Sequence, residues 1–106
     1  MKHVTLVVPK GKVNISSLAG AFQILSRANA HWQKIGHAPK MEISIAGFIE
    51  ELQLDGGFFS IHPVNIEDIK QTGLVIIPSV SYDNNLIKEN AALINWIRNN
   101  IKMVLK

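Results

Sequence analysis

The sequence predicts an α/β fold in which a parallel β-sheet is sandwiched by helices. Two short apolar runs, Val4 to Val8 and Leu74 to Ile77, are typical of strands that are covered on both faces. Segments with apolar residues three and four positions apart lie downstream of both runs, and this spacing predicts amphipathic helices. The resulting order of strand, helix, strand, irregular excursion, strand and helix is the plan of a parallel sheet.

The first expected strand runs from His3 to Pro9, and a loop at 9–12 ends it. A long helix follows, and three polar residues are candidates for its N-cap: Asn14, Ser16 and Ser17. Seven residues recur along one face of that helix: Ile15, Leu18, Phe22, Leu25, Asn29, Trp32 and Ile35. Gly36, reinforced by Pro39, is expected to end it.

The second expected strand covers Met41 to Phe48. Gln53 to His62 contains Asp-Gly-Gly between two short extended stretches, which predicts a small hairpin or an excursion at the sheet edge. A single helical turn is expected at 66–71, with Asn65 as its cap. Leu74 to Pro78 is the next core strand.

The last expected helix has three candidate N-caps: Asp83, Asn84 and Asn85. Its apolar face is expected to carry Ile87, Ala91, Ile94, Ile97, Ile101 and Val104. Both tryptophans, Trp32 and Trp96, fall on or near helix faces, where packing is the expected role.

The predicted sheet is incomplete at the C-terminus. A crossover helix normally returns the chain to another parallel strand, whereas this chain reaches Lys106 at the end of its last helix. We therefore expect residues 1–106 to be the N-terminal part of a longer domain. The alternative is a complete small domain that gains burial by oligomerising. In the first case the edge of the strand at 74–78 lacks a neighbour, which predicts self-association or cover by another chain.

The composition excludes several classes of protein. With 47% apolar and 18% charged residues among 106, the chain has enough apolar material for a core and is unlike a disordered segment. The net charge of +3 is spread along the chain without a basic run and interleaved aromatics, so this segment is not expected to bind nucleic acid. There is no cysteine, which removes disulfides, thiolate metal sites and a cysteine nucleophile from this chain. No stretch has the length of a signal peptide core or a membrane span, so we expect a cytoplasmic protein without membrane contact.

No constellation of residues predicts catalysis or metal binding. The four histidines are far apart and form no metal-binding pattern, so we assign no metal and no cofactor. Ser79 and Ser81 follow a strand but lack the flanking glycines of a nucleophile elbow. Two acidic pairs, Glu50-Glu51 and Glu67-Asp68, are expected to be solvated.

Three segments, in order and spacing, resemble a known family. The run from Val4 to Pro9 is followed by LAGAFQIL at 18–25; Gly57 to Asp68 forms a serine-containing excursion; and LVIIPS at 74–79 precedes ALINWIRNN at 92–100. This pattern resembles the N-terminal part of the ThiJ/PfpI domain of the class I glutamine amidotransferase-like superfamily, in the version found at the front of AraC-family transcriptional regulators. The resemblance implies a flavodoxin-like sheet.

The chain departs from that family where its enzymes carry chemistry. The family's acid near the start of the first helix corresponds to Ser17, and the glycine pair after the later strand corresponds to Ser79-Val80. The family's nucleophilic cysteine would lie beyond Lys106. The resemblance therefore implies a chain without catalytic residues, and we do not expect an enzyme.

The leading hypothesis is a ligand-sensing or dimerisation segment of an AraC-type regulator. Its partners would be an unknown small-molecule ligand and a second copy of the chain, with DNA bound only through a helix-turn-helix domain absent here. The ligand cleft is expected at the carboxyl ends of the strands, lined by Lys10, Gly11, Asn14, Ser17, Ser79, Val80, Ser81 and Tyr82. The alternatives are a fragment of an amidase or hydratase of the same superfamily and a free-standing interaction module.

Overall fold

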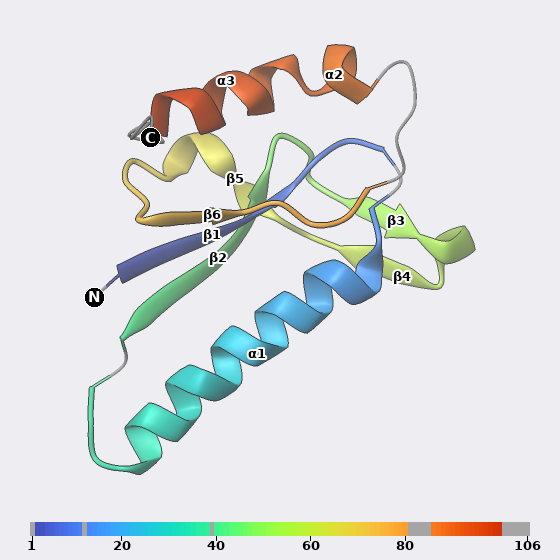
Figure 1. Ribbon diagram of the computed structural model, residues 1–106. Helices are drawn as coiled ribbons and strands as arrows, with labels where there is room; N and C mark the ends of the chain where they lie inside the picture. The colour runs from blue at the N-terminus through green and yellow to red at the C-terminus, as the bar shows by residue number, and fades with distance from the viewer. Residues whose placement is uncertain (1, 12, 39, 81–85, 101–106) are drawn as a thin grey trace.

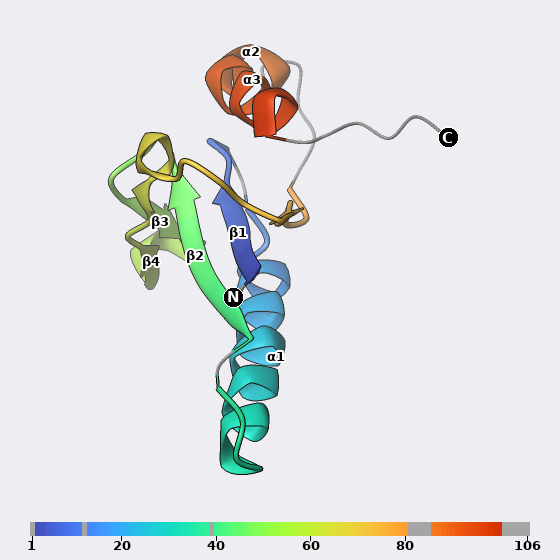
Figure 2. The same cartoon turned by 90° about the vertical axis from the view of Figure 1, so that its left-hand side faces the viewer.

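The computed structural model describes residues 2–11, 13–38, 40–80 and 86–100, and it confirms the α/β fold class. Four parallel strands form one sheet in the order β5-β2-β1-β6: β1 (Lys2–Val8), β2 (Met41–Gly47), β5 (Val64–Asn65) and β6 (Leu74–Ile76). Helix α1 (Ile15–Lys34) covers one face of the sheet, and α2 (Leu86–Glu89) and α3 (Ala91–Asn100) lie over the other, as Figures 1 and 2 show.

Strand β1 is the centre of the core because helices cover both of its faces. Its residues alternate between two apolar clusters, as the two-residue period of a strand requires. Leu6 and Val8 pack with Leu18 of α1 on one face. On the other face Val7 packs in a cluster with buried residues from β2, the 66–68 turn and α3: Ala46, Ile66, Leu93 and Trp96. The apolar run at 4–8 is thus buried on both sides, as predicted.

Helix α1 begins where the sequence predicts, but its buried face is narrower. Asn14 is the N-cap, and its side-chain oxygen accepts hydrogen bonds from the amides of Ser16 (3.0 Å) and Ser17 (3.3 Å). Gly36 follows the helix with a φ of +95°, a left-handed conformation that favours glycine. Two residues expected on the apolar face, Phe22 and Ile35, are instead 37% and 53% exposed.

Beyond Leu25, which packs with the apolar cluster, α1 is attached to the start of β2 by a polar contact. Asn29, which the periodicity placed on the apolar face, donates to the carbonyl of Met41 (2.6 Å) and accepts from its amide (3.1 Å). Trp32 is half-buried and stacks on His37, with ring centroids 4.1 Å apart.

The excursion between β2 and β6 contains the expected hairpin. Strands β3 (Leu52–Leu54) and β4 (Phe59–Ile61) are antiparallel and flank the 3-10 turn η1 (Asp55–Gly57). Gly56 and Gly57 have φ values of +70° and +88°, so glycine suits both positions. A second 3-10 turn, η2 (Ile66–Asp68), is shorter than expected but is capped by Asn65 as predicted. The sequence did not predict the two-residue edge strand β5.

The last helix differs from its prediction in both continuity and orientation. It is divided into α2 and α3 at Asn90. Leu93 and Trp96 are buried against the sheet, and Ile97 of the expected face packs beside them, whereas Ile87 is 64% exposed. The buried face thus shares Ile97 with the predicted one but is centred on Leu93 and Trp96. Ile101, Val104 and the three candidate caps lie outside the described residues. No described helix has the length and apolar character that a membrane crossing requires.

Candidate functional site

The order of the strands defines one point at which the direction of the sheet reverses. The chain passes from β1 through α1 to β2 on one side, whereas β6 pairs with the opposite side of β1. In open α/β sheets a ligand binds in the crevice outside the carboxyl ends of two such strands. By this rule the expected crevice falls between the loops that follow β1 and β6.

Backbone hydrogen bonds connect the β6 loop to the start of α1. Val13 and Val80 form an isolated antiparallel bridge. The Asn14 amide donates to the Ser79 carbonyl at 2.8 Å, and the Ser79 amide donates to Ser17 Oγ at 2.9 Å. Both polar groups of the Ser79 backbone are therefore bonded within the chain.

A second set of hydrogen bonds holds the β1 loop against the helices on the other face. Asn90 is 7% exposed, and its Oδ1 accepts from the Lys10 amide at 2.7 Å. Its Nδ2 donates to the carbonyls of Lys10 and Leu86, both at 2.9 Å. Asn90 thus fixes the loop and the junction between α2 and α3 together. Sequence reasoning missed this residue, because an asparagine in a helical pattern gives no signal for a distant backbone partner.

The structure brings six of the eight expected cleft residues to this crevice. Three of them are hydrogen-bonded to one another, Asn14, Ser17 and Ser79, and Val80 forms a bridge with Val13, next to Asn14. Lys10 and Gly11 lie earlier on the β1 loop, beside the α2–α3 junction. Gly11 has a φ of +123°. Ser81 and Tyr82 lie outside the described residues. Ligand binding by this crevice stays a prediction.

The chemistry available at the crevice is limited. Among its six described residues only Lys10 has a titratable side chain, and it is exposed. The Ser17 hydroxyl, at the position where the resembled enzymes carry an acid, accepts the Ser79 amide proton instead. That amide is consequently not free to stabilise a developing oxyanion. Within the described ranges, no group of three or more histidine and acidic side chains is arranged to hold a metal ion.

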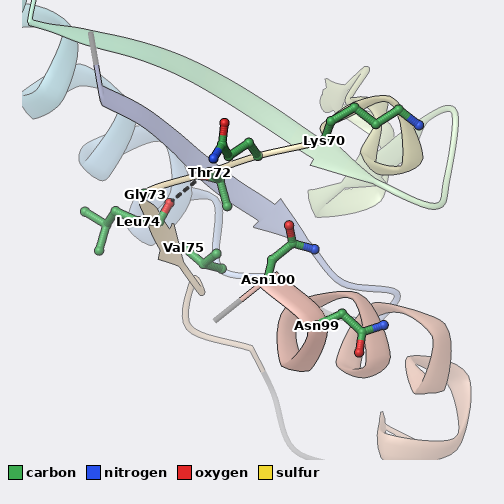
Figure 3. Close-up of a pocket in the computed structure, with 8 residues that line it drawn as sticks. Lys70, Thr72, Gly73, Leu74, Val75, Asn99 and Asn100 are labelled. Carbon is green, nitrogen blue, oxygen red and sulfur yellow. Dashed lines mark hydrogen bonds between the residues drawn. The ribbon is translucent and has the colours of Figure 1, made fainter. Parts of the chain in front are cut away.

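Two cavities lie away from this crevice, at the opposite end of β6. One has a volume of about 570 Å³ and is lined by residues 70–75 together with Asn99 and Asn100 at the end of α3 (Figure 3). The other, of about 260 Å³, lies between the start of β1 and residues 71–73.

Thr72 lines both cavities and belongs to a polar row that crosses the sheet. The Thr5 hydroxyl, which is fully buried, donates to Thr72 Oγ1 at 3.0 Å and lies 3.3 Å from His3 Nδ1. His3 Nε2 is 3.1 Å from Ser44 Oγ on β2. The polar row therefore joins β2, β1 and the entry to β6.

Comparison with known proteins supports the fold. No family model and no curated protein matches the chain. Among solved structures, the chain is similar to a crystal structure from Vibrio parahaemolyticus described as a candidate transcriptional regulator, with a TM-score of 0.72 and 24% identity. The likeness covers 92% of this chain and 49% of that one, so the chain spans about half the length of that protein. At this identity the likeness establishes the α/β fold.

Proposed function

We propose that this chain is a non-catalytic ligand-sensing or dimerisation segment of a cytoplasmic transcriptional regulator of the AraC type. The sequence motifs at 18–25, 74–79 and 92–100 support the ThiJ/PfpI-like identity of the segment. The fold likeness to half of a protein described as a candidate regulator supports the regulatory context. DNA would be bound by a helix-turn-helix domain outside these residues.

One observation carries the non-catalytic part of the proposal. In the hydrogen bond from the Ser79 amide to Ser17 Oγ, the amide that would have to stabilise a developing charge already has a partner within the chain. An enzyme needs donors that are free to bind the charge developing in the transition state. In this chain the serine hydroxyl and the amide instead stabilise the wall of the crevice. A pocket with a fixed wall suits recognition of a ligand.

The test begins with the coding sequence downstream of Lys106. A reading frame that continues into a helix-turn-helix domain supports the proposal, and a stop codon directly after Lys106 contradicts it. A downstream cysteine on a strand-to-helix elbow, without a DNA-binding domain, favours the amidase or hydratase alternative instead.

The second stage measures DNA binding by fluorescence anisotropy, with DNA from upstream of the protein's own gene. The full-length protein is expected to bind with an affinity that falls steeply as salt rises, because phosphate contacts release counterions. Residues 1–106 alone serve as the control and are expected not to bind. Equal DNA binding by the full-length protein and by residues 1–106 would contradict the proposal that DNA is bound only by a domain outside these residues.

A further inference from the structure

The basic residues of this chain form no run, but they are divided unequally from the acidic ones. Residues 1–41 contain six lysines and arginines and no acidic residue, whereas residues 42–69 contain six acidic residues and no lysine or arginine. The first range includes β1 and α1, and the second includes most of β2, the hairpin and β5. A chain with two such blocks carries surfaces of opposite sign, which attract each other between molecules.

The basic block forms an exposed face at the C-terminal end of α1. Arg27, His31 and Lys34 recur at helical spacing and are all exposed, on the side of the helix opposite the apolar cluster. The basic surface continues past the helix, where the Lys40 ammonium group lies 4.3 Å from the centroid of the Trp32 ring. Among the described residues, no acidic side chain lies within ion-pair distance of this face.

The acidic block contributes an exposed patch near the opposite end of α1. Glu50 and Glu51 directly precede β3, and both are exposed. The carboxylate of Glu51 accepts a hydrogen bond from Gln53 at 3.2 Å and lies 4.0 Å from His62 Nδ1. These two neighbours hold the Glu51 side chain on the solvent side of the hairpin.

Both surfaces lie away from the edge of β6. The hairpin lies on the β2 side of β1, whereas β6 pairs with the other side of β1 (Figure 2). Leu54 of the hairpin packs in one cluster with Leu18, so the hairpin adjoins the first half of α1 (Figure 1). The basic face of α1 points away from the sheet. A strand added beside β6 therefore covers neither surface.

We propose that two copies of this chain associate through the outer faces of α1, with the helices antiparallel about a twofold axis near Leu25. The basic end of each helix then lies beside the acidic hairpin of the other copy. In this register Arg27 lies opposite the partner's Gln23, and Lys34 lies opposite the partner's Ser16. The inference deepens the dimerisation part of the proposed function and rests on that part alone.

The dimensions of α1 fit this register. Helix α1 has 20 residues and is about 30 Å long. Lys34 lies about 14 Å from Leu25 along the helix, and Leu18, beside the hairpin, lies about 11 Å away in the other direction. A twofold rotation therefore brings the basic end of one helix to the level of the partner's hairpin, and the interface is self-complementary. A parallel arrangement would place the two basic ends together, where like charges repel.

The first experiment is sedimentation velocity of the full-length protein over a concentration series at two salt concentrations. Between about 0.1 M and about 1 M salt the Debye length falls from about 10 Å to about 3 Å. Dimerisation is therefore expected to weaken on the order of tenfold, since exposed charges hold the two copies together. A monomer at all concentrations, or a dimer that is as strong at high salt as at low salt, overturns the proposal.

The second experiment exchanges the charges of the two surfaces. Arg27→Glu with Lys34→Glu makes the helix face acidic, and Glu50→Lys with Glu51→Lys makes the hairpin basic. Each double variant alone is expected to dimerise more weakly, on the order of tenfold, because like charges then face each other. An equimolar mixture of the two is expected to restore the dimer, since both contacts of the mixed pair join opposite charges. A mixture that stays monomeric overturns the proposal.

The matched control is Lys88→Glu with Arg98→Glu, which makes the same change in net charge at exposed positions of α2 and α3. This variant is expected to dimerise like the wild type, and an equal loss in the control overturns the proposal. Loss of DNA binding in Arg27→Glu with Lys34→Glu, without any change in dimerisation, also overturns it and assigns the basic face to nucleic acid. The dimerisation measurements need neither a ligand nor DNA, so failure here is distinguishable from failure of the regulatory proposal.

Discussion

Replacement of Asn90 by alanine should separate the β1 loop from the helices without altering the apolar core. The substitution removes three hydrogen bonds, two of them to the Lys10 backbone and one to the Leu86 carbonyl. A net contribution of about 1 kcal/mol for each bond gives a loss of roughly 3 kcal/mol. Alanine has a higher helix propensity than asparagine, which offsets about 0.5 kcal/mol of this loss. Because Lys10 is exposed, water can also hydrogen-bond to the Lys10 backbone groups that lose Asn90. We therefore expect the free energy of unfolding to fall by about 2 kcal/mol.

The assay is urea unfolding monitored by tryptophan fluorescence, because Trp96 is buried on α3, which begins directly after Asn90. A loss of about 2 kcal/mol lowers the urea midpoint by about 1–2 M and the melting temperature by about 8–16 °C for a domain of this size. The control is Asn95→Ala, at an exposed position of α3, which should change stability by less than about 0.5 kcal/mol. Equal midpoints for the two variants would refute the structural role of Asn90.

Three further substitutions test other contacts by the same unfolding assay. Asn29→Ala removes both bonds to the Met41 backbone and should cost about 1–2 kcal/mol, so an unchanged midpoint would show that the end of α1 needs no such attachment. Ser17→Ala removes the acceptor of the Ser79 amide and should cost about 1 kcal/mol; increased stability would contradict the role of this bond. Leu18→Ala empties a site that is 2% exposed and should cost about 2–4 kcal/mol, and a loss below 1 kcal/mol would mean that α1 is not held by this residue.

The elements that the sequence predicts well are those whose signals are local. The apolar run of β1, the Asn14 cap and the glycines of the hairpin act within a few residues of one another, so pattern and propensity locate them. The two-residue strand β5 has no pattern of its own. It is a strand because Ala46 and Gly47 lie beside it, and that contact spans the excursion. Its existence depends on the tertiary fold.

The buried face of the last helix shows a different limit. Apolar periodicity alone favours the face with Ile87 and Ile94, because isoleucine recurs there at helical spacing. The structure selects Leu93 and Trp96, because two long-range constraints act on this helix. The Trp96 side chain must be accommodated against the sheet, and Asn90 must reach the Lys10 backbone. Neither constraint can be read from spacing within the helix.

The candidate site was predictable in its position but not in its internal bonding. The rule that crevices form at the carboxyl ends of strands groups Lys10 with Ser79, and in the structure both follow strands at that end of the sheet. It does not reveal which polar groups are already used. The pairing of Ser17 with Ser79 joins residues 62 positions apart, and no sequence pattern encodes it.

These internal bonds restrict the kind of ligand that the crevice can hold. A loop that cradles a phosphate or an oxyanion does so with free backbone amides. Here the amides of Lys10 and Ser79 donate to Asn90 and Ser17, and their carbonyls accept from Asn90 and Asn14. All four backbone groups are engaged before any ligand arrives. A ligand that depends on an amide cradle at Lys10 or Ser79 is therefore disfavoured at this strand end.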